Sequence, residues 1–293
     1  MRLDLLLADY AESNNLGLSR TNIQRLIREG KVSLNSKAAD RPHYKVSCGD
    51  NIKVILPRKE NTEFLPEEIP LDIVYEDDDL LVVNKQPGLV VHPAPGNLEH
   101  TLVNALLGRS IQLSDINKNR PGIVHRLDKE TSGLLVVAKN NSSHLKLAKQ
   151  FARHSIARKY IAIVCGRVQF DEDVIEAPIG RDPLKRKNMA ISFLENTKYA
   201  KTHYRTLKRG DGFSLLELKP FTGRTHQLRV HLAHLGHPIL GDTKYGKNKN
   251  FPRLALHALE IGFIHPSTNK LVHFTSKIPQ EFQEFIKKNF LIN

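Results

Sequence analysis

The chain has 293 residues, of which 44 are lysine or arginine and 31 are aspartate or glutamate, so its formal net charge is +13. This basic excess favours a polyanionic partner, either nucleic acid or an anionic membrane surface, but no apolar run approaches the length needed to span a bilayer. Acidic residues interrupt the apolar N-terminus and only two cysteines are present, so neither a signal peptide nor a disulfide framework is expected, and a cytoplasmic location is predicted.

The first part of the chain predicts two helices followed by short strands. Apolar residues at helical spacing from Leu3 to Tyr10 indicate the first helix. The second helix is expected between a cap at Ser19 and a stop at Gly30. Alternating apolar and polar residues at 31–35 and 51–55 indicate two strands.

A stripe of basic and polar side chains runs opposite the apolar face of the second helix. Its members are Arg20, Gln24, Arg28 and Lys31. Because such a stripe is well suited to contact phosphates, Arg20, Arg28 and Lys31 are predicted to bind a nucleic-acid backbone. On charge pattern alone, a merely solvated helix face is the alternative interpretation.

The segment LSRTNIQRLIREGKVSLN, followed by CGDNIKV, resembles an S4 RNA-binding domain. In that family the second helix and the strand after it lie on RNA. Such domains usually carry Asn-Gly where this chain has Asn35-Ser36, and Asn35 can itself adopt a positive φ. Residues 1–57 are therefore predicted to form an S4 domain. Residues 58–70 are charged and proline-rich and predict an interdomain linker, which leaves 71–293 for a second domain.

Two strands are predicted early in the second domain, at 71–75 and 80–84. Lys85 and His92 lie beside apolar segments, and we interpret them as structural or RNA-contacting groups and not as catalytic ones. Further along, the basic loop at 178–189 is expected to contact the RNA backbone.

The segment PGIVHRLDKETSGLLVVAK places Asp128 on a tight turn ahead of Leu134–Val137, a run typical of a buried strand. Arg126 and Lys129 flank the carboxylate and favour its ionised form. An ordinary surface ion pair is the alternative. Loops held by a rigid scaffold are where functional residues concentrate, so we predict a functional site at Asp128.

HRLDKETSG in this segment resembles the signature of the RluA/RluD family of RNA pseudouridine synthases. VYEDDDLLVVNKQPGLVVHPAPGN, and the order of S4 module, linker and catalytic domain, are most similar to the RluD type, which modifies large-subunit ribosomal RNA. The resemblance implies that Asp128 is the catalytic carboxylate and acts on a uridine flipped out of its RNA fold. Asp128 would either attack C1′ of the sugar or remove the proton at C2′. Neither route requires a cofactor or a metal.

Tyr160 lies at the start of a strand predicted at 159–165, where a tyrosine is ordinarily a core or edge residue. The family resemblance of Arg158-Lys159-Tyr160 implies instead that the ring of Tyr160 stacks on the target base and assists proton transfer.

A helix is expected from a cap at Thr225 to Leu235, with Arg229 at the border of its buried face. A half-buried arginine needs a carboxylate partner. The resemblance to the family motif GR-x-HQ-x-R implies that Asp128 is this partner and that Arg229 belongs to the catalytic group.

The remaining site candidates are predicted to bind substrate. Arg126 flanks the catalytic carboxylate, and Arg224 and His226 are expected to bind phosphate or shape their loop. The resemblance of RLALHA to the family implies that Leu254 lies under the reacting base. Histidines cluster in this part of the chain, but neither H-E-x-x-H nor Cys-x-x-Cys occurs, so no metal site is predicted.

Together these features predict an α+β protein with a mixed, mostly antiparallel sheet and flanking helices. A single essential carboxylate disfavours glycosidases, which need two, and nucleases that hold two metals. The predicted activity is isomerisation of uridine to pseudouridine in structured RNA, foremost large-subunit ribosomal RNA, by a monomer that binds RNA and no membrane. The alternatives are a transfer RNA pseudouridine synthase and a non-catalytic RNA-binding or ribosome-assembly factor, which would be expected to lack Asp128, Tyr160 or Arg229.

Overall fold

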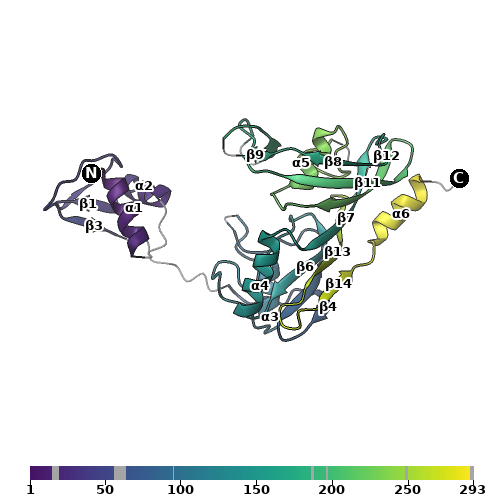
Figure 1. Cartoon of the computed structure of the whole chain (residues 1–293), viewed down its shortest axis with the longest axis horizontal. Coiled ribbons are helices and arrows are strands. Elements are labelled where there is room, and N and C mark those ends of the chain that lie inside the picture. The colour runs from purple at the N-terminus through teal and green to yellow at the C-terminus, as the bar shows by residue number, and fades with distance from the viewer. Residues whose placement is uncertain are drawn as a thin grey trace. The chain divides into compact units, whose positions relative to one another are not determined.

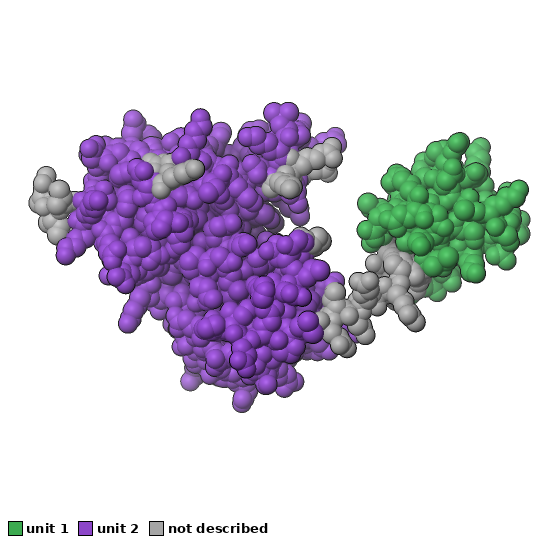
Figure 2. All heavy atoms as spheres, turned by 180° about the vertical axis from the view of Figure 1, so that it is seen from behind, with its two compact units in different colours: residues 1–62 green, residues 63–293 purple. Residues whose placement is uncertain are grey.

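The computed structural model divides the chain into two compact units, residues 1–62 and residues 63–293 (Figures 1 and 2). The residues that it describes are 1–14, 20–55, 64–94, 96–185, 188–195, 197–247 and 250–290. Ser19, the expected helix cap, lies outside them.

The N-terminal unit packs two helices on a small antiparallel sheet with strand order β2-β1-β3. Its elements are α1 (Leu3–Ser13), α2 (Arg20–Arg28), β1 (Val32–Leu34), β2 (Lys37–Ala38) and β3 (Ile52–Val54). Apolar residues of both helices and of β1 form its core, among them Leu3, Ile27 and Val32. The predicted helix and strand order of this unit is confirmed.

A two-residue turn joins β1 to β2, and both of its residues are left-handed: φ is 50° at Asn35 and 66° at Ser36. This is the backbone that tight hairpins require. The Asn35 side chain donates to Asp50 Oδ1 at 2.7 Å and accepts the Asn51 N–H at 2.9 Å. Asn35 thus adopts the positive φ that was expected of it, and its side chain also supplies hydrogen bonds that anchor the turn.

Asp4 is a fully buried carboxylate in this unit. Its oxygens accept hydrogen bonds from Arg2 at 3.0 Å, Arg20 at 2.9 Å and Gln24 at 2.8 Å. Burial by itself would raise the pKa of Asp4, but these donors lower it to about 2. Half of the polar stripe on α2 therefore faces an internal carboxylate, because a buried charge must be paired.

This pairing changes the prediction made for the basic stripe. Two guanidinium nitrogens of Arg20 are occupied by Asp4, which leaves Arg20 only its remaining donors for a phosphate. Arg28 and Lys31 are exposed. These two residues remain the predicted phosphate contacts of this unit.

Asp4→Asn removes the charge that pairs with Arg2 and Arg20, so it is expected to lower the free energy of unfolding of the N-terminal unit near neutral pH. We expect a loss of only about 1–2 kcal/mol, because both arginines are half exposed and solvent screens the pairs. The pKa of Asp4 is lower in the folded chain than in the unfolded chain. The ionised carboxylate therefore stabilises the fold fully at a pH above its ordinary pKa of 3.8, and this contribution is lost as the pH falls toward about 2. Hydrogen exchange of the α1 and α2 amides in the full-length chain measures this loss. Exchange equal to that of the wild type at neutral pH would contradict the assignment.

The second unit is built on one mixed sheet with strand order β4-β5-β6-β13-β7-β12-β11-β8, onto which β14 adds beside β13 (Figure 1). Its strands are β4 (Asp72–Glu76), β5 (Leu80–Lys85), β6 (Ser132–Ala138), β7 (Ala157–Cys165), β8 (Glu172–Glu176), β11 (Lys201–Arg209), β12 (Phe213–Pro220), β13 (Leu256–Ile264) and β14 (Leu271–Thr275). Within the described chain, β6 and β13 form the parallel pair of this sheet and the other pairs are antiparallel. The predicted α+β class with a mixed, mostly antiparallel sheet is confirmed.

Both faces of the central strands are covered. Along β6, Leu135 and Val137 join the larger core, whereas Leu134 and Val136 join a second core on the opposite face. The larger core also takes residues of α3 (Leu102–Gly108), α5 (Gln227–His234) and α6 (Gln280–Asn289), and the second core takes Leu147 of α4 (Asn141–Ala152). Burial on both faces explains why β6 reads as a continuous apolar run instead of an alternating one.

The predicted linker is wrong at its C-terminal end. Residues 64–70 belong to the second unit, where Glu67 N–H donates to the Asn104 carbonyl at 3.0 Å and the Asn104 side chain donates to the Leu65 carbonyl at 2.8 Å. These contacts dock the segment on the start of α3. Composition could not reveal them, because both partners are distant in sequence. Residues 58–63 of the linker prediction lie outside the described residues.

Two further features of the second unit matter for the site: a hairpin outside the main sheet and a glycine at the start of β6. The short strands β9 (Ile179–Arg181) and β10 (Met189–Ile191) pair as a separate antiparallel hairpin. At the start of β6, Gly133 has φ +111°, and a Cβ there would lie 2.2 Å from the Ala258 carbonyl oxygen of β13. Only glycine fits this close approach, which fixes the end of the loop that carries Asp128.

Among the described helices, none combines the length and the apolarity that crossing a bilayer requires.

Candidate active site

An open cavity of about 90 Å³ lies where four segments of the second unit meet. The loop before β6 contributes Asp128, β7 contributes Tyr160, and the segment that enters α5 contributes His226 and Arg229. From β13 comes the apolar side chain of Leu256. The structure thus brings the three predicted catalytic residues, Asp128, Tyr160 and Arg229, to one cavity from positions far apart in the chain.

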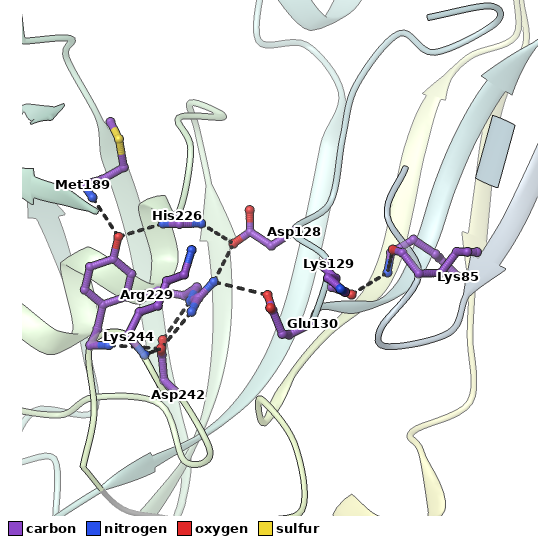
Figure 3. Close-up of polar contacts among 11 residues, drawn as sticks. Lys85, Asp128, Lys129, Glu130, Met189, His226, Arg229, Asp242 and Lys244 are labelled. Atoms are coloured by element: carbon purple, nitrogen blue, oxygen red, sulfur yellow. Dashed lines mark hydrogen bonds and ion pairs between the residues drawn. The ribbon is translucent and has the colours of Figure 1, made fainter. Parts of the chain in front are cut away.

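Buried Lys85 anchors the loop that carries Asp128. Lys85, at the end of β5, is buried and its ammonium donates to the carbonyls of Gln86 at 2.8 Å, Leu89 at 3.0 Å and Lys129 at 3.1 Å (Figure 3). Gly88 N–H donates to the same Lys129 carbonyl at 2.8 Å. Burial lowers the pKa of Lys85 to about 7, against the opposing effect of Asp128. Lys85 therefore ties the loop after β5 to the loop that bears Asp128.

Arg229 is fully buried in α5, at 2% exposure, and not at the border of the helix as predicted. Its main partner is Asp242, a carboxylate that also has 2% exposure. Nε and Nη2 donate to the two oxygens of Asp242, each at 2.8 Å, in a bidentate pair (Figure 3). Burial would lower the pKa of Arg229, but the Asp242 pair outweighs it and raises the pKa. Complete pairing is what permits complete burial.

The remaining side of the guanidinium faces the cavity. Arg229 Nη1 lies 3.4 Å from Asp128 Oδ2 and 3.6 Å from Glu130 Oε2 (Figure 3). The expected pairing of Arg229 with Asp128 is thus present, but it is the secondary contact of a guanidinium that Asp242 orients. Asp128 is bordered by this permanent positive charge and remains in contact with the cavity.

Tyr160 is buried and lines the cavity. Burial raises the pKa of its hydroxyl, and the nearby Asp128 charge adds to this effect against the opposing charge of Arg158. The ring therefore stays neutral at physiological pH. Its backbone is fixed between β12 and β13, where Tyr160 pairs with Leu218 and Ala258. A neutral aromatic ring on a rigid strand is suited to stack against a planar base.

The predicted substrate-binding residues separate into two groups. Arg126, Arg224 and His226 line the cavity. Leu254 does not: it is buried and lies along a neighbouring groove on the Arg253 side, while Leu256 takes the place in the cavity. The RLALHA segment does contribute a leucine to the cavity, but which leucine reaches it depends on how β13 begins, and the motif does not reveal this.

His226, and not Thr225, precedes the first turn of α5. It adopts a left-handed backbone with φ 56° and ψ 19° and makes no side-chain cap. Such a backbone is uncommon for a residue other than glycine and aims its side chain in a particular direction. Here His226 Nε2 comes within 4.0 Å of Asp128 Oδ2. A local rule for helix caps could not anticipate a residue that is held by tertiary contacts.

Three residues of the site were missed by the sequence analysis: Asp242, Tyr245 and Leu256. The segment GDTKYG at 241–246 carries two of them, and Asp242 also accepts the N–H groups of Lys244 at 2.9 Å and Tyr245 at 3.1 Å. Its Gly-Asp start is a turn signal, and that signal was available from the sequence. Nothing local indicated that the carboxylate would hold Arg229.

A group of potential metal ligands lies elsewhere in the second unit, at Asp77, Asp79 and His265. Hydrogen bonds within the chain already use these atoms: His265 Nε2 contacts Asp77 Oδ2 at 2.8 Å, and Asp79 Oδ1 accepts from Ser143 Oγ at 2.8 Å. The group therefore ties β4 and β5 to the segment after β13, and we assign no metal to it.

Comparisons with known proteins identify the family. The family described as RNA pseudouridylate synthase matches residues 79–234, and the S4 domain matches residues 1–52. These matches define an RNA-modifying isomerase joined to an S4 domain. The chain belongs to the RNA pseudouridylate synthase family.

Individual relatives extend over nearly the whole chain. The "Uncharacterized RNA pseudouridine synthase YlyB" of Bacillus subtilis is 45% identical and covers 98% of this chain and 93% of its own. The "Ribosomal large subunit pseudouridine synthase D" of Zymomonas mobilis is 46% identical and covers 100% and 95%. Among solved structures, "Human RNA Pseudouridylate Synthase Domain Containing 1" matches with a TM-score of 0.61 at 32% identity, over 72% of this chain and 84% of that one.

Proposed function

We propose that this protein converts uridines of large-subunit ribosomal RNA to pseudouridine, with Asp128 as the catalytic carboxylate. The observation that carries the proposal is the contact between Asp128 and Arg229 in a cavity that Tyr160 lines. Relatives named ribosomal large subunit pseudouridine synthase D support the choice of substrate.

In the proposed reaction, a flipped uridine enters the cavity and its base stacks on Tyr160. On the first route Asp128 attacks C1′ as the bond from C1′ to N1 breaks, the base rotates, and C5 bonds to C1′ as the bond from C1′ to Asp128 breaks. On the second route Asp128 removes the proton at C2′ as the bond from C1′ to N1 breaks, the base rotates, and C5 bonds to C1′ while Asp128 returns the proton to C2′. The proton first carried by C5 is lost and N1 gains one, so product and substrate have the same composition and no co-substrate is needed. The fixed charge of Arg229 would hold Asp128 in place throughout these steps.

The basic residues around the cavity favour a polyanionic substrate. Arg126, Arg158, Arg224 and Arg229 all line it, against the single carboxylate of Asp128. The S4 domain, with Arg28 and Lys31 exposed, would add phosphate contacts of its own. We therefore propose that RNA is the partner of both units and that the enzyme works as a cytoplasmic monomer.

Pseudouridine mapping of ribosomal and transfer RNA from cells lacking this protein tests the proposal. We expect the loss of specific pseudouridines in large-subunit ribosomal RNA, and their return when the wild-type gene is restored but not when the Asp128→Asn gene is. Losses confined to transfer RNA would favour the sibling substrate. An unchanged pseudouridine map would favour the non-catalytic alternative.

A further inference from the structure

The polar neighbours of Asp128 continue away from the cavity through His226 and Tyr245. His226 Nε2 faces Asp128 Oδ2 at 4.0 Å, and His226 Nδ1 lies 2.7 Å from the hydroxyl of Tyr245. That hydroxyl oxygen also accepts the backbone N–H of Met189 at 2.9 Å. Figure 3 draws these contacts from Met189, the first residue of β10 in the β9–β10 hairpin, through to Asp128.

The direction of the bond from Met189 follows from what its groups can donate, and that of the bond between Tyr245 and His226 depends on the histidine tautomer. The amide of Met189 can only donate, so the Tyr245 oxygen is an acceptor in that bond. The hydroxyl proton of Tyr245 then has His226 Nδ1 as its hydrogen-bond acceptor among the described residues. When Tyr245 donates to Nδ1, that nitrogen is unprotonated and the imidazole proton lies on Nε2, where it faces the Asp128 carboxylate.

Contacts with Asp242, Arg229 and His226 restrain Tyr245. Its backbone N–H donates to Asp242 Oδ1 at 3.1 Å, and the guanidinium carbon of Arg229 lies 5.3 Å from its ring centroid. Its ring meets the His226 ring edge to face, with centroids 5.5 Å apart. The hydroxyl therefore has little freedom to turn away from His226. Together with the left-handed backbone of His226, this rigidity indicates that the fold holds the Tyr245 hydroxyl and the His226 ring in one fixed geometry.

We propose that Tyr245 and His226 are positioning residues of the reaction, which hold a neutral imidazole with its Nε2–H directed at Asp128. This inference rests on the proposed function for its activity measurements. When substrate fills the cavity, a small movement of Asp128 would let Nε2–H bind Oδ2 and leave Oδ1 free for the sugar. A neutral donor orients the carboxylate, whereas an imidazolium would neutralise the charge that the reaction uses.

The charges that face His226 have opposing effects on its protonation. Burial lowers the pKa of His226, as do Arg229 and Lys244, whereas Asp128 and Asp242 raise it. The hydrogen bond from Tyr245 to Nδ1 favours the neutral form, because a donor there occupies the lone pair that would take a proton. Removal of that donor is therefore expected to raise the pKa of His226 and to release the choice of tautomer.

The hairpin enters this arrangement through the hydrogen bond from Met189 to Tyr245. Met189 N–H occupies the Tyr245 oxygen and so directs the hydroxyl proton toward His226. A shift of β10 on binding RNA would change the state of His226 and, through it, the orientation of Asp128. The bond from Met189 thereby connects the hairpin to the reacting carboxylate.

Tyr245→Phe tests the proposal because it keeps the ring over Arg229 and removes only the hydroxyl. We expect kcat to fall about tenfold at neutral pH, the loss of roughly one hydrogen bond, with KM for RNA within about twofold. We also expect kcat to fall further as the pH is lowered from about 7.5 to about 6, where the released His226 takes up a proton. Tyr75→Phe is the matched control, because it also removes a tyrosine hydroxyl. Tyr75 lies on β4, and its hydroxyl donates to Asp77 at 2.8 Å.

Nitrogen-15 NMR of the free full-length protein reads the tautomer without any substrate. We expect the wild-type His226 to carry its proton on Nε2, and Tyr245→Phe to lose this preference. A wild-type proton on Nδ1, or a Tyr245→Phe variant with the wild-type kcat and pH profile, would overturn the proposal. Because the NMR result needs no RNA, an error in the proposed ribosomal substrate would leave it readable.

Discussion

Asp128→Asn is expected to lower pseudouridine formation by more than about 10⁴-fold, while the affinity for RNA changes little. An amide can neither attack C1′ nor remove the C2′ proton, so both proposed routes stop. The variant should still fold, because Asp242 continues to pair with the buried Arg229 through two hydrogen bonds of 2.8 Å. Pseudouridine assay and filter binding on the same ribosomal RNA fragment measure the two effects separately.

The neighbouring carboxylate provides the matched control. Glu130 lies on the same loop and its Oε2 is 3.6 Å from the same Arg229 nitrogen that contacts Asp128, but its side chain is 44% exposed. Glu130→Gln is expected to lower the rate by less than about tenfold, because a solvated charge has a weak effect on its neighbours. If Asp128→Asn kept measurable turnover while Glu130→Gln did not, the assignment of the catalytic carboxylate would move to Glu130.

Asp242→Asn should destabilise the fold more than Asp4→Asn or Glu281→Gln. We expect the free energy of unfolding to fall by about 3–5 kcal/mol, because the buried charge of Arg229 loses its main partner. Activity should fall as well, since Arg229 would lose the orientation that directs Nη1 toward Asp128. Denaturant unfolding gives the first quantity and single-turnover kinetics at a temperature where the variant is folded gives the second.

A partly exposed arginine–carboxylate pair in the same unit is the comparison for this effect. Arg253 and Glu281 are joined at 2.7 Å, with Glu281 34% exposed. Glu281→Gln is expected to change stability by less than about 1 kcal/mol, because solvent screens the pair. Similar losses in Asp242→Asn and Glu281→Gln would show that burial of the Arg229 pair contributes nothing particular to the fold.

Much of the fold could be predicted because the local pattern and the tertiary environment agree. The run Leu134–Val137 became the doubly buried strand β6, and Gly133 at its start is required by the close approach of β13. The two helices of the N-terminal unit follow their apolar spacing. The linker prediction extended too far, because residues 64–70 owe their order to Asn104, which composition does not reveal.

By itself, the sequence determined the two-unit organisation of an S4 domain and a synthase domain, the turn that carries Asp128, and the helix that carries Arg229, because each depends on neighbouring residues. Tertiary structure alone decided which charges meet: Arg229 is separated from Asp128 by 101 positions and pairs more closely with Asp242. It also decided that Leu256, and not Leu254, reaches the cavity. The physical reason is that a buried ion pair and a strand register are set by packing between distant segments, which leaves no periodic or local mark in the chain.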